Sequence, residues 1–242
     1  MNSVALVIPC KDESKRLVDS AILAAVENYA YLTLLFVNDG SADATSERLA
    51  FLERQSPSIR VLNLEQNVGK AEAVRTGVNW ALRNTACEAV GFWDADLATP
   101  LDELPRFVDT LDAFEHYEAV IGSRWPHLGA DIDRNVFRHC TGSLMKFLIR
   151  RVLHAPVYDT QCGAKLFRRR TAERIFSTPF KSRWLFDVEL LKRIGIHRLD
   201  TAVVELPLRS WRDVAGSKLS FADSIRTFPE LVAISLQHSK ML

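Results

Sequence analysis

Four short apolar runs, separated by helical patterns, constrain the fold of this chain more than any other feature of its sequence. The runs cover residues 4–8, 33–37, 59–64 and 90–93. Apolar residues recur at helical spacing between them, over residues 16–29, after residue 43 and over residues 71–82. Strands that alternate with helices in this way predict a parallel sheet with right-handed crossover connections.

Polar residues follow each apolar run. The four polar segments are residues 9–13 (PCKDE), 38–41 (NDGS), 67–70 (NVGK) and 94–96 (DAD). The carboxyl ends of parallel strands meet at one edge of a sheet, and ligands of such sheets bind beyond that edge. The sequence therefore predicts a ligand site built from these four segments.

The last segment holds two carboxylates, Asp94 and Asp96, one residue apart. Pro100 prevents a simple continuation of the strand, but both carboxylates point to the same side if strand geometry persists to residue 96. Carboxylates held this close repel each other unless a cation or a proton lies between them. A divalent metal with hard oxygen ligands meets that need. The alternative is a solvated turn in which one aspartate caps the next helix.

The composition is typical of a folded globular protein. Of the 242 residues, 48% are hydrophobic and 25% are charged, which argues against disorder. The formal net charge of +1 provides no field that would attract nucleic acid. The four cysteines (Cys10, Cys87, Cys140 and Cys162) form no CxxC pair, so we expect reduced thiols rather than a disulfide framework or a zinc site. No repeat or linker composition interrupts the chain, and we expect one domain over residues 1–242.

The second half of the chain is less regular. We expect helices over residues 101–114, 136–153, 187–194 and 219–237, strands over residues 119–122, 164–168 and 202–206, and loops over residues 126–134, 158–163 and 209–217. The three arginines at 168–170 are expected on a solvated face. The second and fourth of these helices are amphipathic and moderately basic, which suits a membrane interface, although such helices more often pack on their own domain. No run approaches the ~18 apolar residues of a membrane-spanning helix.

Four motifs, in order along the chain, give it a resemblance to a known family. They are residues 7–9 with Glu13, residues 37–41, residues 67–71 and residues 94–96. Together they resemble the family-2 glycosyltransferases with the GT-A fold. The resemblance implies an α/β fold with a Rossmann-like, mostly parallel central sheet and helices on both faces. It divides the chain into a nucleotide-sugar-binding half (residues 1–100), an acceptor half (residues 101–218) and an amphipathic C-terminal helix (residues 219–242).

Motifs of the second half narrow the resemblance to the polyprenyl-phosphate hexose synthases. They are residues 122–124 (GSR), 159–167 (DTQCGAKLF), 183–191 (RWLFDVELL) and 216–219 (GSKL). The DTQCG and FDVELL segments look more like the dolichyl-phosphate β-glucosyltransferase branch than the mannose branch. The chain departs from the family pattern at Lys11, Asp12, Ala98 and Ala164, and we expect no counterpart of the N-terminal membrane anchor of the eukaryotic members. Ala98 replaces a glutamine that neighbours the metal in the mannose-type enzymes.

The resemblance assigns roles to individual residues. It implies that Asp96 binds Mg²⁺ or Mn²⁺ directly and that Asp94 supports the metal or the ribose, so that the cation stabilises the departing nucleoside diphosphate. The substrate-binding residues that we expect are Pro9, Glu13, Asp39, Gly69, Lys70, Asp94, Arg124, Gln161, Arg212 and Lys218. A turn cap is the alternative role for Asp39. The alternative for Lys70 is a solvated position in the first turn of a helix.

Two further carboxylates, Asp187 and Asp159, are the candidate catalytic residues. Asp187 occupies the place where many family-2 enzymes keep a general base, but it can equally cap the helix over residues 187–194. Asp159 can orient the acceptor instead. A hydroxyl acceptor requires a base, whereas a phosphate is already an anion at neutral pH and does not.

The sequence thus favours a metal-dependent, inverting transfer of a hexose, with glucose from UDP-glucose preferred, to a polyprenyl phosphate. Two alternatives stay open: transfer to a hydroxyl acceptor in cell-surface glycan synthesis, and a non-catalytic nucleotide-sugar-binding protein. A nucleotidyltransferase is disfavoured because residues 9–13 contain no glycine. We expect a cytoplasmic protein without a nucleic acid partner, and peripheral contact with the cytoplasmic membrane face stays open.

Overall fold

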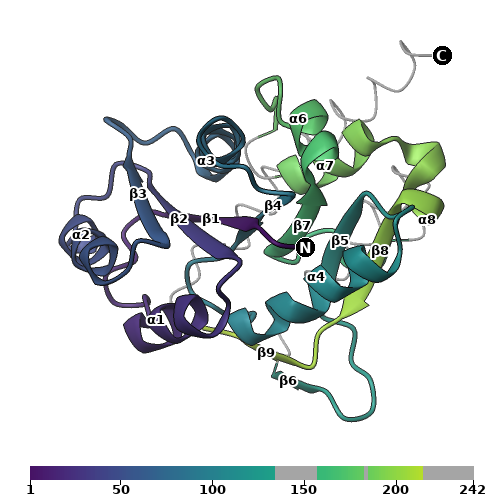
Figure 1. The fold of residues 1–242 in the computed structure, drawn as a ribbon, viewed down its shortest axis with the longest axis horizontal. Helices are drawn as coiled ribbons and strands as arrows, with labels where there is room; N and C mark the ends of the chain where they lie inside the picture. The colour runs from purple at the N-terminus through teal and green to yellow at the C-terminus, as the bar shows by residue number, and fades with distance from the viewer. Residues whose placement is uncertain (134–156, 183–184, 215–242) are drawn as a thin grey trace, which may run out of the picture.

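The computed structural model describes residues 1–133, 157–182 and 185–214. Figure 1 shows their helices and strands. Several predicted features lie outside the described residues: the helices over residues 136–153 and 219–242, Lys218, and residues 183 and 184 of the FDVELL motif region.

A seven-stranded sheet forms the centre of the molecule, with the strand order β3-β2-β1-β4-β7-β5-β8 (Figure 1). Its strands are β1 (Val4–Cys10), β2 (Leu32–Asn38), β3 (Ile59–Asn63), β4 (Ala89–Trp93), β5 (Ala119–Ser123), β7 (Ala164–Arg168) and β8 (Val203–Pro207). The first four strands are parallel to one another, which confirms the parallel sheet predicted for the first half. β7 lies antiparallel between β4 and β5, and β8 is parallel to β5. The loop before β7 therefore reaches the edge at which β4 and β5 end.

Helices cover both faces of the sheet, as the sequence predicted. One face carries α1 (Asp19–Asn28), α2 (Thr45–Gln55) and α4 (Leu104–Ala113), and the other carries α3 (Lys70–Asn84), α6 (Arg169–Ile175) and α7 (Phe186–Ile194). Alternate residues of β1 belong to the two apolar clusters. Leu6 and Ile8 pack with the first group of helices, and Ala5 and Val7 pack with the second. This two-residue period is that of a strand buried on both faces.

The first strand continues beyond its predicted end. β1 runs through Pro9 to Cys10, whereas the sequence predicted a strand that stops at Ile8. β2 pairs with β1 along its whole length, but β4 pairs with it only as far as Val7. A proline, which has no N–H, is tolerated at this half-open end of the strand.

Short elements of the second half also differ from the prediction. β6 (Asp131–Asp133) and β9 (Ser210–Arg212) form a two-stranded parallel sheet where the sequence predicted loops. Three residues are too few to show a strand period, so the sequence carried no signal for them. The helix predicted over residues 101–114 begins with the 3₁₀ turn η1 (Leu101–Glu103), and η2 (Ile196–Arg198) and α8 (Leu199–Ala202) precede β8.

Arginine side chains bind backbone carbonyls at the opposite edge of the sheet, where β4 and β5 begin. Three of them donate to carbonyls at or just beyond the ends of α4, α3 and α7: Arg168 to Phe114 (3.3 Å), Arg169 to Thr85 (3.1 Å) and Arg174 to Ile194 (3.3 Å). A helix leaves its last carbonyls without intrahelical partners and carries partial negative charge there. A guanidinium group at this end donates hydrogen bonds to the carbonyls and its positive charge offsets the negative one. The predicted solvated face is therefore wrong for Arg168 and Arg169, while Arg170 is exposed.

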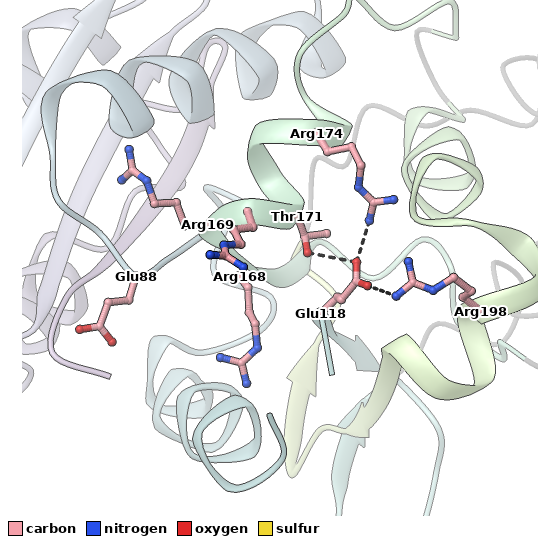
Figure 2. Close-up of a pocket in the computed structure, with 8 residues that line it drawn as sticks. Glu88, Glu118, Arg168, Arg169, Thr171, Arg174 and Arg198 are labelled. Carbon is pink, nitrogen blue, oxygen red and sulfur yellow. Dashed lines mark hydrogen bonds and ion pairs between the residues drawn. The ribbon is translucent and has the colours of Figure 1, made fainter. Parts of the chain in front are cut away.

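A cavity of about 440 Å³ lies at this arginine edge. Figure 2 shows Arg174 and Arg198 reaching the carboxylate of Glu118 from two sides. Thr171 Oγ1 donates to the same carboxylate at 3.2 Å. Ion pairs and carbonyl contacts thus occupy Arg168, Arg169, Arg174 and Arg198, four of the five arginines that line the cavity, and tie the helices to the sheet.

Gly91 of β4 lies where a side chain has no room. A Cβ at this position would meet Lys165 O of β7 at 2.1 Å and Leu166 Cα at 3.0 Å. We predict that Gly91→Ala lowers the free energy of unfolding by about 3 kcal/mol or more, because β7 would have to move away from β4. Urea denaturation followed by circular dichroism measures this loss.

Gly129→Ala is the control for this prediction. A Cβ at Gly129 would meet nothing within 4 Å, and only its φ of +85° opposes a side chain. We expect a loss of about 1 kcal/mol for this variant. A Gly91→Ala protein as stable as the wild type would contradict the close packing of β4 against β7.

Candidate active site

Hydrogen bonds join the loops that follow β1 and β2 to the start of α3. The backbone N–H of Asp39 donates to Cys10 O at 2.8 Å. The buried carboxylate of Asp39 accepts hydrogen bonds from the backbone N–H groups of Val68 and Gly69, at 2.6 and 2.9 Å. Asp39 therefore holds the loop before α3 against the end of β2, in keeping with the turn-capping alternative.

Two glycines shape these loops through backbone conformations that other residues rarely adopt. Gly40 has a φ of +63°, and a Cβ there would meet Asn67 N at 2.9 Å. Gly69 has a φ of +89° and is the N-cap of α3. The free N–H groups and the positive end of the helix dipole at the start of α3 favour an anion at this edge.

Glu13 lies at the end of β1 beside these loops. Its backbone N–H donates to Thr45 Oγ1 at 2.8 Å, which joins it to the start of α2. Its buried carboxylate pairs with Arg16, whose Nε lies 2.6 Å from Oε2. Pro9 and Glu13 are thus placed at the same sheet edge as Asp39, while the side chain of Glu13 already has a cationic partner.

The two carboxylates of the DAD motif are placed by a turn. β4 ends at Trp93, and the N–H of Leu97 donates to Asp94 O at 3.1 Å. Leu97 has a φ of +49°, which is uncommon for a residue with a side chain. The strand geometry through residue 96 that the sequence left open is therefore not formed, and the turn sets the positions of Asp94 and Asp96.

Lys70, the first residue of α3, forms an ion pair with Asp94. Partial desolvation lowers the pKa of Lys70, but the negative charges of Asp94, Asp187 and Asp96 outweigh this effect and raise that pKa. The side chains of Lys70 and Asp94 are 41% and 36% exposed, so a ligand can reach both. Lys70 thus lies within the field of three site carboxylates.

Gly163 provides the space that Asp94 occupies. The backbone N–H of Asp94 donates to Gly163 O at 3.0 Å. A Cβ at Gly163 would lie 1.9 Å from Oδ2 of Asp94, so the carboxylate fills the place of a side chain. The DTQCG motif requires its glycine because the DAD motif packs on it.

Asp96 has a pKa raised by its burial and by the charge of Asp94. Its Oδ1 accepts a hydrogen bond from the N–H of Ala98 at 3.1 Å. Within the described residues, no group of three or more His, Cys, Asp or Glu side chains could hold a metal ion. The pair nevertheless fits a cation such as Mg²⁺, which binds one or two carboxylates and completes its shell with substrate phosphates and water. Burial is the larger cause of the raised pKa, and the repulsion from Asp94, which adds to it, is what such a cation would relieve.

Arg124, just after β5, forms a two-point ion pair with the fully buried Asp159. The distances from Nε to Oδ2 and from Nη2 to Oδ1 are both 2.7 Å. Burial disfavours the charged form of Arg124, but the charge of Asp159 raises its pKa overall. The guanidinium carbon lies 5.3 Å from the centroid of the Trp211 ring. Glu205 accepts the N–H groups of Tyr158 and Asp159, at 2.8 and 2.7 Å, which fixes this loop.

Lys165 of β7 is fully buried and pairs with Asp187 in the first turn of α7. Its Nζ also donates to Cys162 O at 2.6 Å and lies 5.2 Å from the centroid of the Phe92 ring. Leu185 is the N-cap of α7, so the alternative in which Asp187 caps this helix is wrong. A carboxylate in the first turn still interacts favourably with the helix dipole.

The structure brings the predicted site residues that it describes to one edge of the sheet. At this edge lie Pro9, Glu13, Asp39, Gly69, Lys70, Asp94, Asp96, Arg124, Asp159, Gln161 and Asp187. Arg212 joins them through its backbone N–H, which donates to Ala98 O at 3.0 Å. Its side chain is 73% exposed and pairs with Asp131. The chemical roles of all these residues stay predictions.

Sequence reasoning missed two residues of the site, Lys165 and Gly163. A lysine inside an otherwise apolar strand was the available signal for Lys165, because a buried ammonium group requires a partner. Gly163 belongs to the DTQCG motif, but nothing local to it in the sequence indicates the contact with Asp94. That contact depends on how β7 pairs with β4.

Solved structures share the fold of this chain. The chain aligns with mannosyl-3-phosphoglycerate synthase from Rubrobacter xylanophilus with a TM-score of 0.70 and 18% identity, over 99% of this chain and 75% of that one. It aligns with glucosyl-3-phosphoglycerate synthase from Mycobacterium tuberculosis, in complex with Mn²⁺, UDP-glucose and phosphoglyceric acid, with a TM-score of 0.65 and 20% identity, over 97% and 80% of the two chains. This likeness confirms the predicted GT-A fold.

Sequence comparison then gives the family. The model of Glycosyl transferase family 2 matches residues 5–176, and the chain belongs to that family. Its relatives include the dolichyl-phosphate β-glucosyltransferases of Dictyostelium discoideum (32% identical, over 97% of this chain and 74% of that protein) and Homo sapiens (31% identical, over 89% and 69%). These relatives confirm the predicted branch of the family and the prediction that the chain is a glycosyltransferase.

Breaking the Lys165–Asp187 pair would leave a buried charge without compensation. We predict that Lys165→Met or Asp187→Asn alone lowers the free energy of unfolding by about 3–5 kcal/mol, and that the double variant recovers part of the combined loss. Urea denaturation of the four proteins, treated as a double-mutant cycle, measures the coupling between the two side chains.

Asp131→Asn is the control for this cycle. It removes an ion pair with Arg212 in which both side chains are mostly exposed, at 64% and 73%. We expect this variant to change the free energy of unfolding by less than about 0.5 kcal/mol. If the losses of the two buried variants simply added, Lys165 and Asp187 would not be coupled.

Proposed function

We propose that this chain transfers glucose, with inversion, from UDP-glucose to a polyprenyl phosphate. The relatives named above are dolichyl-phosphate β-glucosyltransferases, which supports both the sugar and the acceptor. A structural neighbour was solved with UDP-glucose and Mn²⁺, which supports the donor. In a single displacement, the acceptor phosphate attacks the anomeric carbon from the side opposite the departing nucleoside diphosphate.

One observation supports a phosphate acceptor over a hydroxyl acceptor: both candidate bases are held in ion pairs. Arg124 binds Asp159 at two points, and the buried Lys165 binds Asp187. If either carboxylate took up a proton, a largely buried cation would lose the negative charge with which it forms an ion pair. A phosphate acceptor arrives as an anion and needs no base, whereas a hydroxyl acceptor needs one. The paired carboxylates therefore favour a phosphate acceptor.

We also propose that Asp96 and Asp94 hold Mg²⁺ or Mn²⁺ beside the donor diphosphate. When bound, the cation acts as a Lewis acid that stabilises the departing nucleoside diphosphate. Lys70 adds positive charge at the same place, because its amine lies beside Asp94 at the start of α3. Asp39 holds the loop before α3 in the shape against which the nucleoside would bind.

A polyprenyl acceptor brings the site to a lipid surface. No helix within the described residues is long and apolar enough to cross a membrane. We propose peripheral contact with the cytoplasmic face of a membrane, from which the acceptor phosphate enters the site. We therefore propose that the protein acts in the cytoplasm, at the membrane surface.

We predict that the purified protein transfers glucose from UDP-glucose to a polyprenyl phosphate in the presence of Mg²⁺ or Mn²⁺, and not to phosphoglyceric acid or soluble glycans. Radiolabelled UDP-glucose and organic extraction measure the glycolipid product, and UDP-galactose and GDP-mannose serve as donor controls. Transfer to water-soluble acceptors alone would overturn the proposed acceptor. Binding of UDP-glucose without turnover of any acceptor would favour the non-catalytic alternative.

Asp96→Asn tests the proposed metal site. We predict that this variant lowers kcat by about a hundredfold or more, because it removes the carboxylate predicted to bind the cation directly. Asp200→Asn is the control, since Asp200 is an exposed residue of α8 at the other edge of the sheet. Initial rates across a titration of Mg²⁺ and Mn²⁺ provide the measurement. Asp96→Asn turnover at the wild-type rate would contradict the role of this pair.

A further inference from the structure

Three buried polar side-chain atoms beside the Arg124–Asp159 pair have no hydrogen-bond partner within the described part of the chain. They are Ser123 Oγ, Thr160 Oγ1 and Gln161 Nε2. Ser123 is 1% exposed and Thr160 is 2% exposed. Buried polar atoms nearly always have a partner in folded proteins, and each one without a partner is destabilising. Three such atoms in two neighbouring segments point to a ligand.

The strand register places Ser123 on the same face of the sheet as Asp94. Continuing the pairing of β7 with β4 and with β5 brings Asp94 and Ser123 to the two sides of Gly163. Ile121 and Phe92, two residues earlier, both pack on the α3 and α7 face, and a strand repeats every two residues. Adjacent strands lie about 4.8 Å apart, so roughly 10 Å separates the backbones at Asp94 and Ser123.

The loop before β7 brings Thr160 and Gln161 to the same place. The carboxylate of Asp159 accepts a hydrogen bond from the backbone N–H of Arg124 at 3.1 Å, in addition to the guanidinium contacts. This bond holds the loop along the end of β5, next to Ser123. Ser123 and the loop that carries Thr160 and Gln161 are therefore joined through Arg124 and Asp159, and Gly163 at the end of this loop packs on the Asp94 carboxylate.

The chemistry of these atoms matches neutral hydroxyl groups better than phosphate. The hydroxyls of serine and threonine both donate and accept hydrogen bonds, and the amide nitrogen of glutamine donates. Two cations of this region, Arg124 and Lys165, already pair with aspartates and do not add free charge. A hexose ring carries several hydroxyl groups, each of which is both a donor and an acceptor.

We propose that Ser123, Thr160 and Gln161 form a subsite that binds hydroxyl groups of the transferred hexose, beside the aspartates that face the diphosphate. This inference rests on the proposed function and adds the residues that recognise the sugar. The subsite contacts the hexose and leaves the nucleotide untouched, so UDP alone does not engage it. The free protein keeps three unpartnered polar atoms that the bound sugar satisfies.

Thr160→Val tests the subsite because it removes the hydroxyl and keeps the branched shape of the side chain. We expect the affinity for UDP-glucose, measured by isothermal titration calorimetry with Mg²⁺, to fall about tenfold or more, and the affinity for UDP to stay within about twofold. Thr171→Val is the matched control. Thr171 is 4% exposed, but its hydroxyl donates to Glu118 at the arginine edge, so its UDP-glucose affinity should equal that of the wild type.

Melting temperatures of the ligand-free proteins provide a second measurement. Thr160→Val and Ser123→Ala should melt at or above the wild-type temperature, because each removes a hydroxyl that has no partner. Thr171→Val should melt at a lower temperature, because it leaves Glu118 with one hydrogen bond fewer. We therefore expect Thr160→Val to lose donor affinity without loss of stability, and Thr171→Val to lose stability without loss of donor affinity.

Three results would overturn the subsite while leaving the proposed function in place. The first is a parallel loss of UDP and UDP-glucose affinity in Thr160→Val. The second is an unchanged UDP-glucose affinity in both Thr160→Val and Ser123→Ala. The third is a lowered melting temperature with unchanged affinity, which would assign the hydroxyl to an internal, water-mediated hydrogen bond. A wild-type protein that binds neither UDP nor UDP-glucose would overturn the proposed function and the subsite together.

Discussion

The antiparallel insertion of β7 between β4 and β5 is the constraint on which the rest of the site depends. It places Gly163 against the carboxylate of Asp94 and brings residues 158–163 to the edge where β4 and β5 end. The same insertion leaves no room for a side chain at Gly91. The packing of the sheet and the geometry of the site therefore both require β7 to lie against β4, because any shift that separates the two strands also removes the support under Asp94.

Ion pairs between different elements organise the charges of the site. The pairs are Asp94 with Lys70 of α3, Asp159 with Arg124 after β5, and Asp187 of α7 with Lys165 of β7. The pKa of Asp96 is raised by burial and by the neighbouring charge of Asp94. Positive charge beside Asp94 and Asp96 would relieve their repulsion, and the pairs of Asp159 with Arg124 and of Asp187 with Lys165 join separate elements of the fold.

The sequence predicted the parts of the molecule that repeat with a local period. The strands of the first half follow from continuous apolar runs and the helices from apolar residues at helical spacing, and the geometry of parallel sheets predicted that their polar ends share one edge. The sequence could not predict contacts that depend on the pairing of distant segments, such as Gly163 with Asp94 or Lys165 with Asp187. It also gave no signal for β6 and β9, which are too short to show a period, or for the carbonyl contacts of Arg168 and Arg169.

The arginine contacts at the beginning of β4 and β5 lie at the opposite edge of the sheet from the candidate site. Guanidinium groups there fasten the ends of α4, α3 and α7 to the sheet, about one strand length away from the substrate edge. Loops at the substrate edge can therefore diversify in sequence while the opposite edge preserves the ability to fold. In the proposed subsite, Thr160 and Gln161 are the positions of this loop at which sugar preference can be redesigned while Gly163 still supports Asp94 and Asp159 still pairs with Arg124.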